Sequence, residues 1–489
     1  MATARRNKRR STSSISPPKP RQTVCLETTD SNVFRRRADF LNWASTARDP
    51  QAQAALLANQ FIQQNRGILH QLGVLIEIAY DRATVDLVFR TGTRVGAIPL
   101  ISPTTGQPDY GLIVQPRFGW QGIGPMLGEM GWRIIPQPLR LPSLPRSDRK
   151  IPGWVLSTIV LFRLRALLDR LERRFEFSEL DCPAPRGSVR WTEYAIERLP
   201  SARFLSVPCR FPDLRDDREL KAAIHFTLRR QLISLQGQRH AGVVALQLID
   251  LCLRLLERVR LVAPKEPEPL RFQSWLRGPL KTGVFRDGLQ AIEWTVEETG
   301  LAGLADLQGL PWVMSMEEFF EAWVEAIFAR VARHKGGQLR VGRKRETISP
   351  IVWNPPYAGS QKYLLPDLVL ERDTETLIVD AKFKGHWEEL QLGHWGELDE
   401  VLREHHRTDL LQVLAYSTVA ASKTITVCLV YPCAYQTWEF LKRQGRIAYR
   451  GNVRAGTRKI DILLTAVPMI ARLGEVATEL EKACFTGAN

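Results

Sequence analysis

The chain has 489 residues, of which 44% are hydrophobic and 25% are charged, a composition typical of a soluble globular protein. This length exceeds what one hydrophobic core usually serves, so two or three domains are expected. Lys and Arg outnumber Asp and Glu by 68 to 52, which gives a formal net charge of +16 and favours a polyanionic partner over a neutral one.

Several classes of protein do not fit this sequence. The seven cysteines are scattered without a CxxC pair, so we expect neither a disulfide framework nor a zinc site, and a reducing cytoplasm suits the chain best. No stretch approaches the roughly 18–20 apolar residues of a membrane span. The longest candidate, Trp154 to Phe162, stops at Arg163. No GxxxxGK(S/T) phosphate loop occurs, so the sequence shows no nucleotide-driven motor of its own.

Residues 1–25 are predicted to form a disordered basic tail. This segment is rich in Ser and Pro and carries seven Lys and Arg residues before the first acidic residue, Glu27. A basic start that runs into Ser and Pro instead of an apolar segment is not a secretory signal. One hypothesis is that the tail holds DNA, and the alternative is a solvated tail without a partner.

Residues 26–150 are predicted to form a β-rich domain that docks on a partner. Residues 49–67 have helical spacing, and glycines at both ends of 122–131 indicate a second, short helix. Short β-branched runs bounded by turn residues predict strands over 74–80, 84–89 and 110–117.

Residues 151–300 have a different pattern, which predicts a helical middle domain and a linker. Apolar residues recur at helical spacing, with many arginines on the opposite face, over 155–174, 218–234 and 243–262. The prolines of 263–270 interrupt helix repeatedly, so this stretch is the predicted linker.

Residues 301–489 are predicted to form a C-terminal mixed α/β domain, which makes the whole chain an α+β, multidomain protein. The pattern begins with a helix over 316–333 and a basic loop at 340–345. The elements predicted after the loop are strands over 367–371 and 377–383, a helix over 398–422, a strand over 424–431, two more strands and a last helix.

The residues that carry chemistry lie on the first two of these strands. Asp380 ends an apolar strand, and Lys382 lies two residues further on, so both side chains point to one face. Asp367 follows Pro366 at the start of the preceding strand, and a hairpin would bring it near Asp380. Two carboxylates suit Mg²⁺, and a lysine beside the ion suits phosphodiester hydrolysis. The alternative is two strand-end aspartates beside a solvated lysine.

A carboxylate on the preceding helix would complete such a site. Glu321 and Glu317 share a face with apolar residues, and we favour Glu321, with Glu317 second, as the supporting acid. Glu318 and Glu325 are predicted to be more solvated. The alternative is a surface helix rich in glutamate.

Two polar residues on a later helix are further candidates. Gln412 and Tyr416 lie four residues apart, on one helical face, where they would support the metal site or contact a DNA phosphate. The alternative is a partly buried helix whose polar residues satisfy local backbone. The histidines that follow the site do not have zinc-ligand spacing and are interpreted as surface or supporting residues; they are His386, His394, His405 and His406.

At this point the sequence resembles McrC-type proteins, the nuclease subunits of McrBC-like and LlaJI-like restriction systems. The similar pieces are Met316 to Val324, Pro366-Asp367, Asp380 to Lys384, Gln412 to Tyr416 and, upstream, Gly111 to Arg117, Gly124 to Met130, Arg186-Gly187 and Val207 to Arg229. The resemblance runs in islands from about residue 75 to 440. The chain has Pro116-Arg117 where the family pattern would have Pro-Lys, and the Arg-rich tail is not a family feature.

The resemblance implies a PD-(D/E)xK nuclease with Mg²⁺, or alternatively Mn²⁺, as its ion. It implies Asp367 and Asp380 as metal ligands, Lys382 as the catalytic lysine and Glu321 as a supporting acid that also serves the metal. Its implied partners are double-stranded DNA and an AAA+ GTPase or ATPase, with which the chain would form a hetero-oligomer. The resemblance also implies that this subunit stimulates the AAA+ partner through its N-terminal domain. Such a system defends the cell against foreign DNA. The rival hypotheses are a non-catalytic activator of a motor and a stand-alone repair or transposon-associated nuclease.

Overall fold

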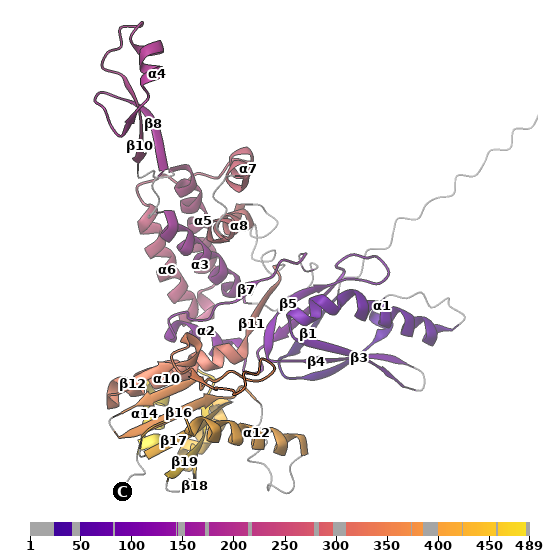
Figure 1. The fold of residues 1–489 in the computed structure, drawn as a ribbon. Helices are drawn as coiled ribbons and strands as arrows, with labels where there is room; N and C mark the ends of the chain where they lie inside the picture. The colour runs from indigo at the N-terminus through magenta and orange to yellow at the C-terminus, as the bar shows by residue number, and fades with distance from the viewer. Residues whose placement is uncertain are drawn as a thin grey trace, which may run out of the picture.

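The computed structural model of the chain has three regions that follow one another in the sequence (Figure 1). It describes residues 24–41, 49–81, 84–142, 144, 152–171, 176–213, 218–277, 283–296, 310–372, 374–384, 400–422, 424–455 and 458–485. An N-terminal region of sheets and one long helix is followed by a stack of helices with a slender arm, and then by a C-terminal sheet flanked by helices. The chain is therefore a mixed α/β, multidomain protein, as predicted.

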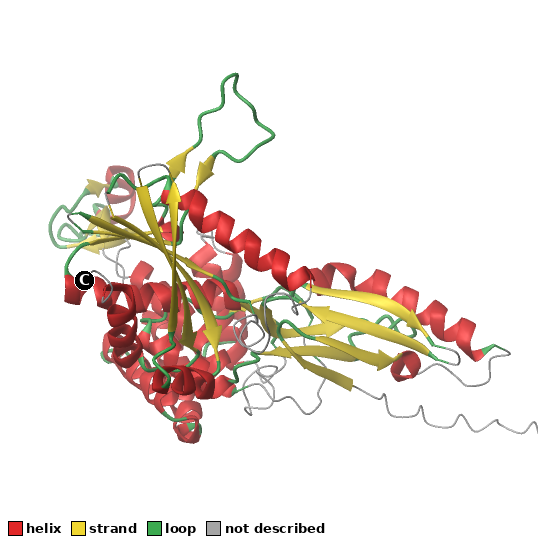
Figure 2. Ribbon diagram, turned by 90° about the horizontal axis from the view of Figure 1, so that it is seen from below, coloured by secondary structure: helices red, strands yellow, loops and turns green. Residues whose placement is uncertain are grey.

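The N-terminal region contains two sheets and the long helix α1, which lies along them (Figure 2). The strand order is β1-β6-β5-β11-β7 in one sheet and β2-β4-β3 in the other. The elements are β1 (Val24–Thr29), β2 (Val33–Arg37), η1 (Ala38–Leu41), α1 (Pro50–Gln71), β3 (Val74–Tyr80), β4 (Val85–Thr91), β5 (Arg94–Leu100), β6 (Tyr110–Gln115), α2 (Trp120–Glu129), β7 (Gln137–Pro138) and β11 (Trp312–Ser315).

Local patterns predicted part of this region correctly. The helix expected at 49–67 is α1, whose first turn is capped by the Asp49 side chain, and the expected strands are β3, β4 and β6. The strands β1, β2 and β5 were not predicted, and residues 24 and 25, assigned to the tail, begin β1. β5 contains Gly96 and Pro99, two residue types that are disfavoured in strands, so local propensity offered little indication of it. It lies inside the sheet because it pairs with β6 on one side and β11 on the other.

The strand β11 joins the N-terminal sheet from far along the chain. It pairs antiparallel with β5 and β7, although it lies beyond residue 300, where the sequence suggested a division between domains. The helix α10 (Met316–Lys335) follows it at once, and the Ser315 side chain caps this helix by accepting the Glu318 N–H at 3.2 Å. The N-terminal sheet therefore fixes the position of the helix that carries the candidate acids.

The middle region is a stack of helices, as predicted, with an arm that was not predicted. The helices are α3 (Gly153–Leu171), α5 (Arg218–Gly237), η3 (Arg239–Ala241), α6 (Val243–Val259), α7 (Pro269–Arg277) and α8 (Gly283–Val296), so helix resumes inside the segment interpreted as a linker. The arm at the top of Figure 1 consists of β8 (Glu176–Cys182), β9 (Ser188–Val189), α4 (Trp191–Glu193), η2 (Tyr194–Arg198) and β10 (Val207–Asp213). Prolines at 208 and 212 argued locally against a strand in β10.

The C-terminal region is built on a six-stranded sheet of order β12-β15-β16-β17-β19-β18. The pairs β16–β17 and β17–β19 are parallel, and the others are antiparallel. The elements are β12 (Gln338–Val341), η4 (Gly342–Lys344), β13 (Ser349–Pro350), β14 (Tyr363–Leu364), β15 (Leu368–Glu371), β16 (Glu375–Ala381), α12 (Glu400–Ser417), β17 (Thr424–Cys433), α13 (Tyr435–Arg443), β18 (Ala448–Ala455), β19 (Arg458–Pro468) and α14 (Leu473–Phe485).

Helices cover both faces of this sheet. The α12 side is marked by Thr376, whose hydroxyl lies 2.6 Å from that of Ser422 just after the helix. The other side is marked by Leu377, which lies in one pocket with residues at the ends of α10 and α14. Alternation along β16 therefore points Asp380 and Lys382 toward α12.

One hydrophobic core extends through all three regions. It includes Ile113 of the N-terminal sheet, Leu164 of the middle helices and Val427 of the C-terminal sheet, all of which are buried. A second cluster packs beneath α1 around Phe61 and Phe89. In the described part of the chain no helix is long and apolar enough to cross a membrane. The seven cysteines all lie in described segments, and no disulfide joins them.

The contact between β5 and β11 predicts a steric requirement at Gly96. A Cβ at this position would overlap the Trp312 carbonyl oxygen, so Gly96→Ala should lower the free energy of unfolding by about 1–3 kcal/mol. In α1, a Cβ at Gly67 meets nothing within 4 Å, so Gly67→Ala should instead raise it by about 1 kcal/mol. Urea unfolding of both variants checks this pair, and a Gly96 variant as stable as the wild type would contradict the packing.

Candidate active site

Asp367 and Asp380 meet across a hairpin of two strands. β15 and β16 pair antiparallel with Leu368 opposite Val379, so the next positions, Asp367 and Asp380, face each other. The Ala381 N–H donates to Asp367 Oδ2 at 2.7 Å, and the Asp380 side chain is buried. The hairpin expected from the sequence is therefore present and brings the two carboxylates together.

Lys382 lies directly after β16 and turns its side chain to Asp380. Its backbone N–H donates to the Val430 carbonyl at 2.8 Å, which extends the pairing with β17 one residue past the strand. Its Nζ lies 2.7 Å from Asp380 Oδ2, and only 17% of the side chain is exposed. The strand alternation that placed Asp380 and Lys382 on one face is confirmed.

Gln412 and Tyr416 on α12 continue this chain of polar contacts. Lys382 Nζ donates to Gln412 Oε1 at 2.9 Å, and Gln412 Nε2 donates to the Tyr416 hydroxyl oxygen at 2.7 Å. The one-face placement predicted from their four-residue spacing is confirmed, and the pair supports the lysine beside the carboxylates. Lys382 is thus held from two sides, by Asp380 on its own strand and by Gln412 on a helix.

The acids of α10 differ from one another in burial. Glu321 is half-buried, whereas Glu317 is exposed and does not lean into the core as its helical face suggested. Burial raises the pKa of Glu321 to about 6; Arg343 opposes this rise, and nearby acids including Asp380 add to it. Of the two candidates, Glu321 is therefore the one in electrostatic contact with the aspartate pair.

The sequence placed Glu325 wrongly. It was predicted to be solvated like Glu318, which is indeed exposed, but the Glu325 side chain is only 3% exposed. Its burial depends on Arg133, Arg343 and Lys344, which surround its carboxylate. Arg133 lies almost two hundred positions away in the sequence, so helical periodicity alone could not find the arrangement.

A second ion pair, whose carboxylate is buried, lies beside the site and was not predicted. Lys384 Nζ lies 2.6 Å from Asp409 Oδ1, and the Tyr431 hydroxyl donates to Asp409 Oδ2 at 3.1 Å. Lys384 continues the alternation of Asp380 and Lys382, which is a signal that the sequence offered. Burial is the main cause that raises the pKa of Asp380, and the negative charge of Asp409 adds to it.

The N-terminal region reaches the end of β16 through an aromatic contact. The Arg117 guanidinium lies 4.5 Å from the centre of the Phe383 ring, and the Phe320 ring of α10 lies 6.0 Å from it. Asp30 pairs with Arg117 at 3.7 Å between Oδ2 and Nε. Phe383 follows Lys382 directly, so residues of the first sheet region help to fix the backbone of the lysine.

The two aspartates lie in surroundings that raise their pKa values. Burial raises the pKa of Asp367 well above its usual value, and the charges of Asp380 and Glu321 raise it further. Burial also raises the pKa of Asp380, although Lys382 partly opposes this. Crowded buried carboxylates with perturbed pKa values are characteristic of catalytic or cation-binding sites.

The donor atoms at this site suit a hard cation. Mg²⁺ is commonly bound by one or two carboxylates together with waters and substrate phosphates, and Asp367 and Asp380 supply two. Within the described ranges, no group of three His, Cys, Asp or Glu side chains is arranged to hold a metal ion by itself. His386 and His394 lie outside the described residues, and on α12 His405 is exposed while His406 is buried.

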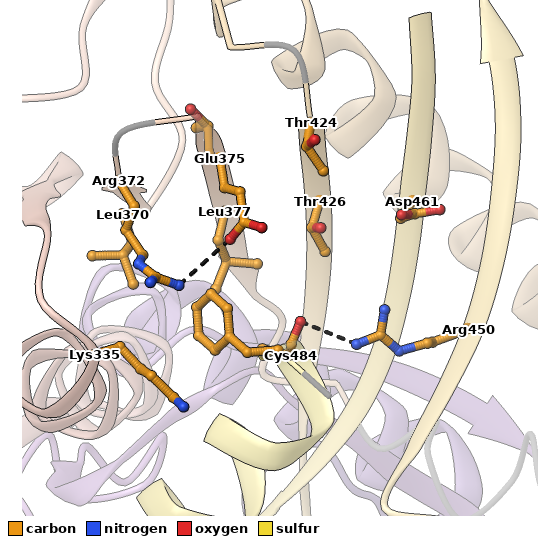
Figure 3. A pocket seen from close by; sticks show the side chains of 12 residues that line it. Lys335, Leu370, Arg372, Glu375, Leu377, Thr424, Thr426, Arg450, Asp461 and Cys484 are labelled. Atoms are coloured by element: carbon orange, nitrogen blue, oxygen red, sulfur yellow. Dashed lines mark hydrogen bonds and ion pairs between the residues drawn. The ribbon is translucent and has the colours of Figure 1, made fainter. Parts of the chain in front are cut away.

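A separate pocket lies at the opposite end of the same strands (Figure 3). It has a volume of about 200 Å³ and is lined by Glu375 at the start of β16 and Thr424 at the start of β17, whereas the aspartate pair lies at the carboxyl end of β16. Arg372 pairs with Glu375 at 3.4 Å, and Arg450 donates to the Cys484 carbonyl at 3.0 Å. In this pocket Arg372 and Glu375 neutralise each other, and Arg450 caps a carbonyl group of α14.

Comparison with known proteins finds a family model that matches part of the chain. The family model of the McrBC 5-methylcytosine restriction system component matches residues 297–432, a segment that contains Asp367, Asp380, Lys382 and Gln412. The predicted resemblance to the McrBC family is thereby confirmed. A search of curated proteins finds no match.

Two McrBC structures from Thermococcus gammatolerans are similar to this chain. One is a half-complex from a tetradecameric assembly of McrB AAA+ hexamers with bound McrC, at 14% identity and a TM-score of 0.43, covering 94% of this chain and 99% of that chain. The other is an McrBC complex, at 14% identity and a TM-score of 0.24, covering 63% of this chain and 88% of that chain.

The crowding of carboxylates predicts how stability depends on pH. Because burial, Asp380 and Glu321 raise the pKa of Asp367 on folding, the folded state binds more protons than the unfolded state above the ordinary aspartate pKa. The free energy of unfolding of the metal-free protein should therefore fall as pH rises through the raised pKa. Asp367→Asn keeps an oxygen to accept the Ala381 N–H but removes the charge. We expect it to raise stability at alkaline pH and to flatten the pH dependence.

The measurement is urea unfolding in EDTA across a pH series. Asp250→Asn is the matched control, because Asp250 is 62% exposed on α6 and pairs only with Arg254 in the next turn among the described contacts. An Asp367 variant that is less stable than the wild type at alkaline pH would contradict the expected repulsion.

Proposed function

We propose that this chain is a Mg²⁺-dependent DNA endonuclease subunit of a McrBC-like restriction system, with a C-terminal domain of the PD-(D/E)xK type. The observation that carries the proposal is the buried pair Asp367 and Asp380, with Lys382 fixed beside it by Gln412. The family match over residues 297–432 supports the restriction system, and the excess of 68 basic over 52 acidic residues suits a DNA substrate.

The residues of the site would divide the chemistry of phosphodiester hydrolysis. Asp367 and Asp380 would hold the ion, with Glu321 as a supporting acid on α10. A bound Mg²⁺ would supply an activated water and neutralise charge on the phosphate oxygens. The carboxylates of Asp380 and Asp367 raise the pKa of Lys382 although burial opposes its charge. Lys382 therefore stays protonated and is suited to stabilise developing negative charge rather than to accept a proton.

The proposed partner is an AAA+ GTPase or ATPase in a hetero-oligomer, as the family resemblance implies, with the N-terminal region as the part that docks on it. The chain has no phosphate loop, which suits a subunit that depends on a separate motor. Nuclease action would then be coupled to nucleotide hydrolysis by the partner. We place the chain in the cytoplasm, where foreign DNA arrives.

The first test is DNA cleavage with Mg²⁺ in the presence of the AAA+ protein encoded beside this chain and its nucleotide. We expect the wild type to cut and Asp380→Ala to lose at least about 100-fold in rate, because the substitution removes a carboxylate of the proposed metal site. Asp461→Ala is the control, since Asp461 lies on β19 and pairs with Lys459 away from the site.

Each rival function predicts a different result in this experiment. If neither the wild type nor the variant cuts but both stimulate nucleotide hydrolysis, the chain is a non-catalytic activator. If the wild type cuts equally well without partner and nucleotide, it is a stand-alone nuclease.

The contact between Lys382 and Gln412 predicts a positioning role for the amide. Gln412→Ala should lower kcat by up to roughly 100-fold, because the lysine loses its helical anchor, while DNA affinity stays unchanged. Tyr416→Phe should have a smaller effect, because the hydroxyl contacts Lys382 only through Gln412. Leu411→Ala, on the exposed face of the same helix, is the control. Steady-state cleavage kinetics decide, and an equal loss in DNA affinity would argue against positioning.

A further inference from the structure

Glu325 is a buried carboxylate that is surrounded by more positive charges than the one required to neutralise it. It lies on α10 one turn beyond Glu321, and its side chain is only 3% exposed. Arg133 Nη1 lies 2.5 Å from Oε1 and Arg343 Nη2 lies 2.5 Å from Oε2. Lys344 Nζ lies 3.7 Å from Oε1. One negative charge therefore faces three positive charges, and two remain unbalanced within this cluster.

The three cations come from two distant parts of the chain. Arg133 lies between α2 and β7 of the N-terminal region, whereas Arg343 and Lys344 belong to η4. A buried carboxylate needs a partner to offset its lost hydration, and one cation would serve that purpose. Holding three cations together costs repulsion, so their convergence suggests an anionic ligand that supplies the missing negative charge.

The cluster lies next to the candidate active site. The Gly342 N–H donates to the Asp367 carbonyl at 2.7 Å, so the turn that carries Arg343 is fastened to the backbone of an active-site aspartate. Arg343 also acts electrostatically on Glu321. Arg133 and Glu321 both line a cleft of about 760 Å³ between the N-terminal sheet and α10. Arg133 therefore shares this cleft with Glu321, and the turn that carries Arg343 and Lys344 adjoins the backbone of Asp367.

The side chains of the cluster remain accessible to a ligand. Exposure is 38% for Arg133, 27% for Arg343 and 57% for Lys344, in contrast to the buried carboxylate beneath them. A guanidinium has five N–H donors, and the contact with Glu325 uses only part of them. The remaining donors suit phosphate oxygens, which arginine binds in pairs.

We propose that Arg133, Arg343 and Lys344 form a phosphate clamp for the DNA backbone next to the cleaved bond, and that Glu325 is the positioning residue that holds them. This inference rests on the proposed nuclease function. It assigns the clamp to both the N-terminal region and the C-terminal sheet, so the DNA-binding surface is complete only when these regions are packed together. It also gives Glu325 a role distinct from that of Glu321, which the proposed function assigns to the metal site.

The clamp predicts a change in how DNA binding depends on salt. The full-length protein is titrated onto a fluorescent duplex in EDTA, which prevents cleavage, at several KCl concentrations. Arg343→Gln should weaken binding by roughly tenfold and reduce the slope of log affinity against log salt by about 0.9, the value for one phosphate contact. Arg133→Gln should act in the same way. A purely structural role would lower the melting temperature without changing the slope.

Arg340→Gln is the matched control. Arg340 lies three residues before Arg343 and pairs with Glu371 at 2.5 Å on the neighbouring strand β15. Its substitution removes the same charge from the protein but should leave the salt slope unchanged. An unchanged slope in both Arg343→Gln and Arg133→Gln, or an equal decrease in Arg340→Gln, would overturn the clamp.

Glu325→Gln separates positioning from overall charge. This substitution removes a negative charge, so long-range attraction alone predicts tighter DNA binding. The positioning role predicts the opposite, a loss of at least about threefold, because the cations lose the anion that gathers them. Tighter or unchanged binding by a variant that unfolds cooperatively would refute the positioning role. If Glu325→Gln does not fold, the salt slopes of the Arg133 and Arg343 variants decide.

The outcome also separates this inference from the nuclease proposal. If the wild type binds DNA with the expected slopes but does not cut it with Mg²⁺ and its partner, the nuclease proposal fails and the clamp stands. If the wild type cuts DNA while the clamp variants bind and cut as it does, the clamp fails and the nuclease proposal stands.

Discussion

The repulsion between two buried carboxylates is the constraint on which the rest of the site depends. Asp367 and Asp380 face each other at one rung of the β15–β16 hairpin. Burial raises the pKa of both carboxyls, and the charge of Asp380 raises the pKa of Asp367 further. A fold keeps such an arrangement only if neighbouring groups offset part of the cost. The Ala381 N–H donates a hydrogen bond to Asp367, and the Lys382 ammonium forms an ion pair with Asp380. The remaining negative charge is what a cation would neutralise.

The surrounding fold holds this hairpin from three directions. α12 contributes Gln412 to the lysine, and α10 brings Glu321 to the aspartates. The N-terminal region contributes Arg117, which stacks on Phe383 immediately after the lysine. Since β11 ties α10 into the N-terminal sheet, a shift of that sheet would move the helix that carries Glu321. This coupling would give the proposed docking of a partner on the N-terminal region a physical route to the site.

The sequence predicted those parts of the site that follow from local periodicity. Alternation along a strand placed Asp380 beside Lys382, and four-residue spacing on a helix paired Gln412 with Tyr416. The PD and DxK positions also fitted a hairpin, which the register confirms. These patterns depend only on neighbours in sequence, so the predictions made from them hold whatever tertiary contacts the rest of the chain forms.

The parts that the sequence missed depend on contacts between distant segments. Glu325 on α10 was expected in solvent because nothing nearby in sequence revealed Arg133 above it. The strand β11 was missed because its partners β5 and β7 lie some two hundred residues earlier. The arm between β8 and β10 was hidden by prolines that local propensity counts against a strand. In each case tertiary pairing overrode the local signal.

Charge balance distinguishes the two ends of the C-terminal sheet. In the pocket at the amino ends of β16 and β17, Arg372 is matched by Glu375, and Arg450 caps the end of α14, so these contacts stabilise the fold without calling for a ligand. At the carboxyl end, two facing aspartates share one lysine, while three cations nearby share one glutamate. The arrangement would suit the proposed substrate, because a metal ion would neutralise the aspartates and DNA phosphates would neutralise the three cations.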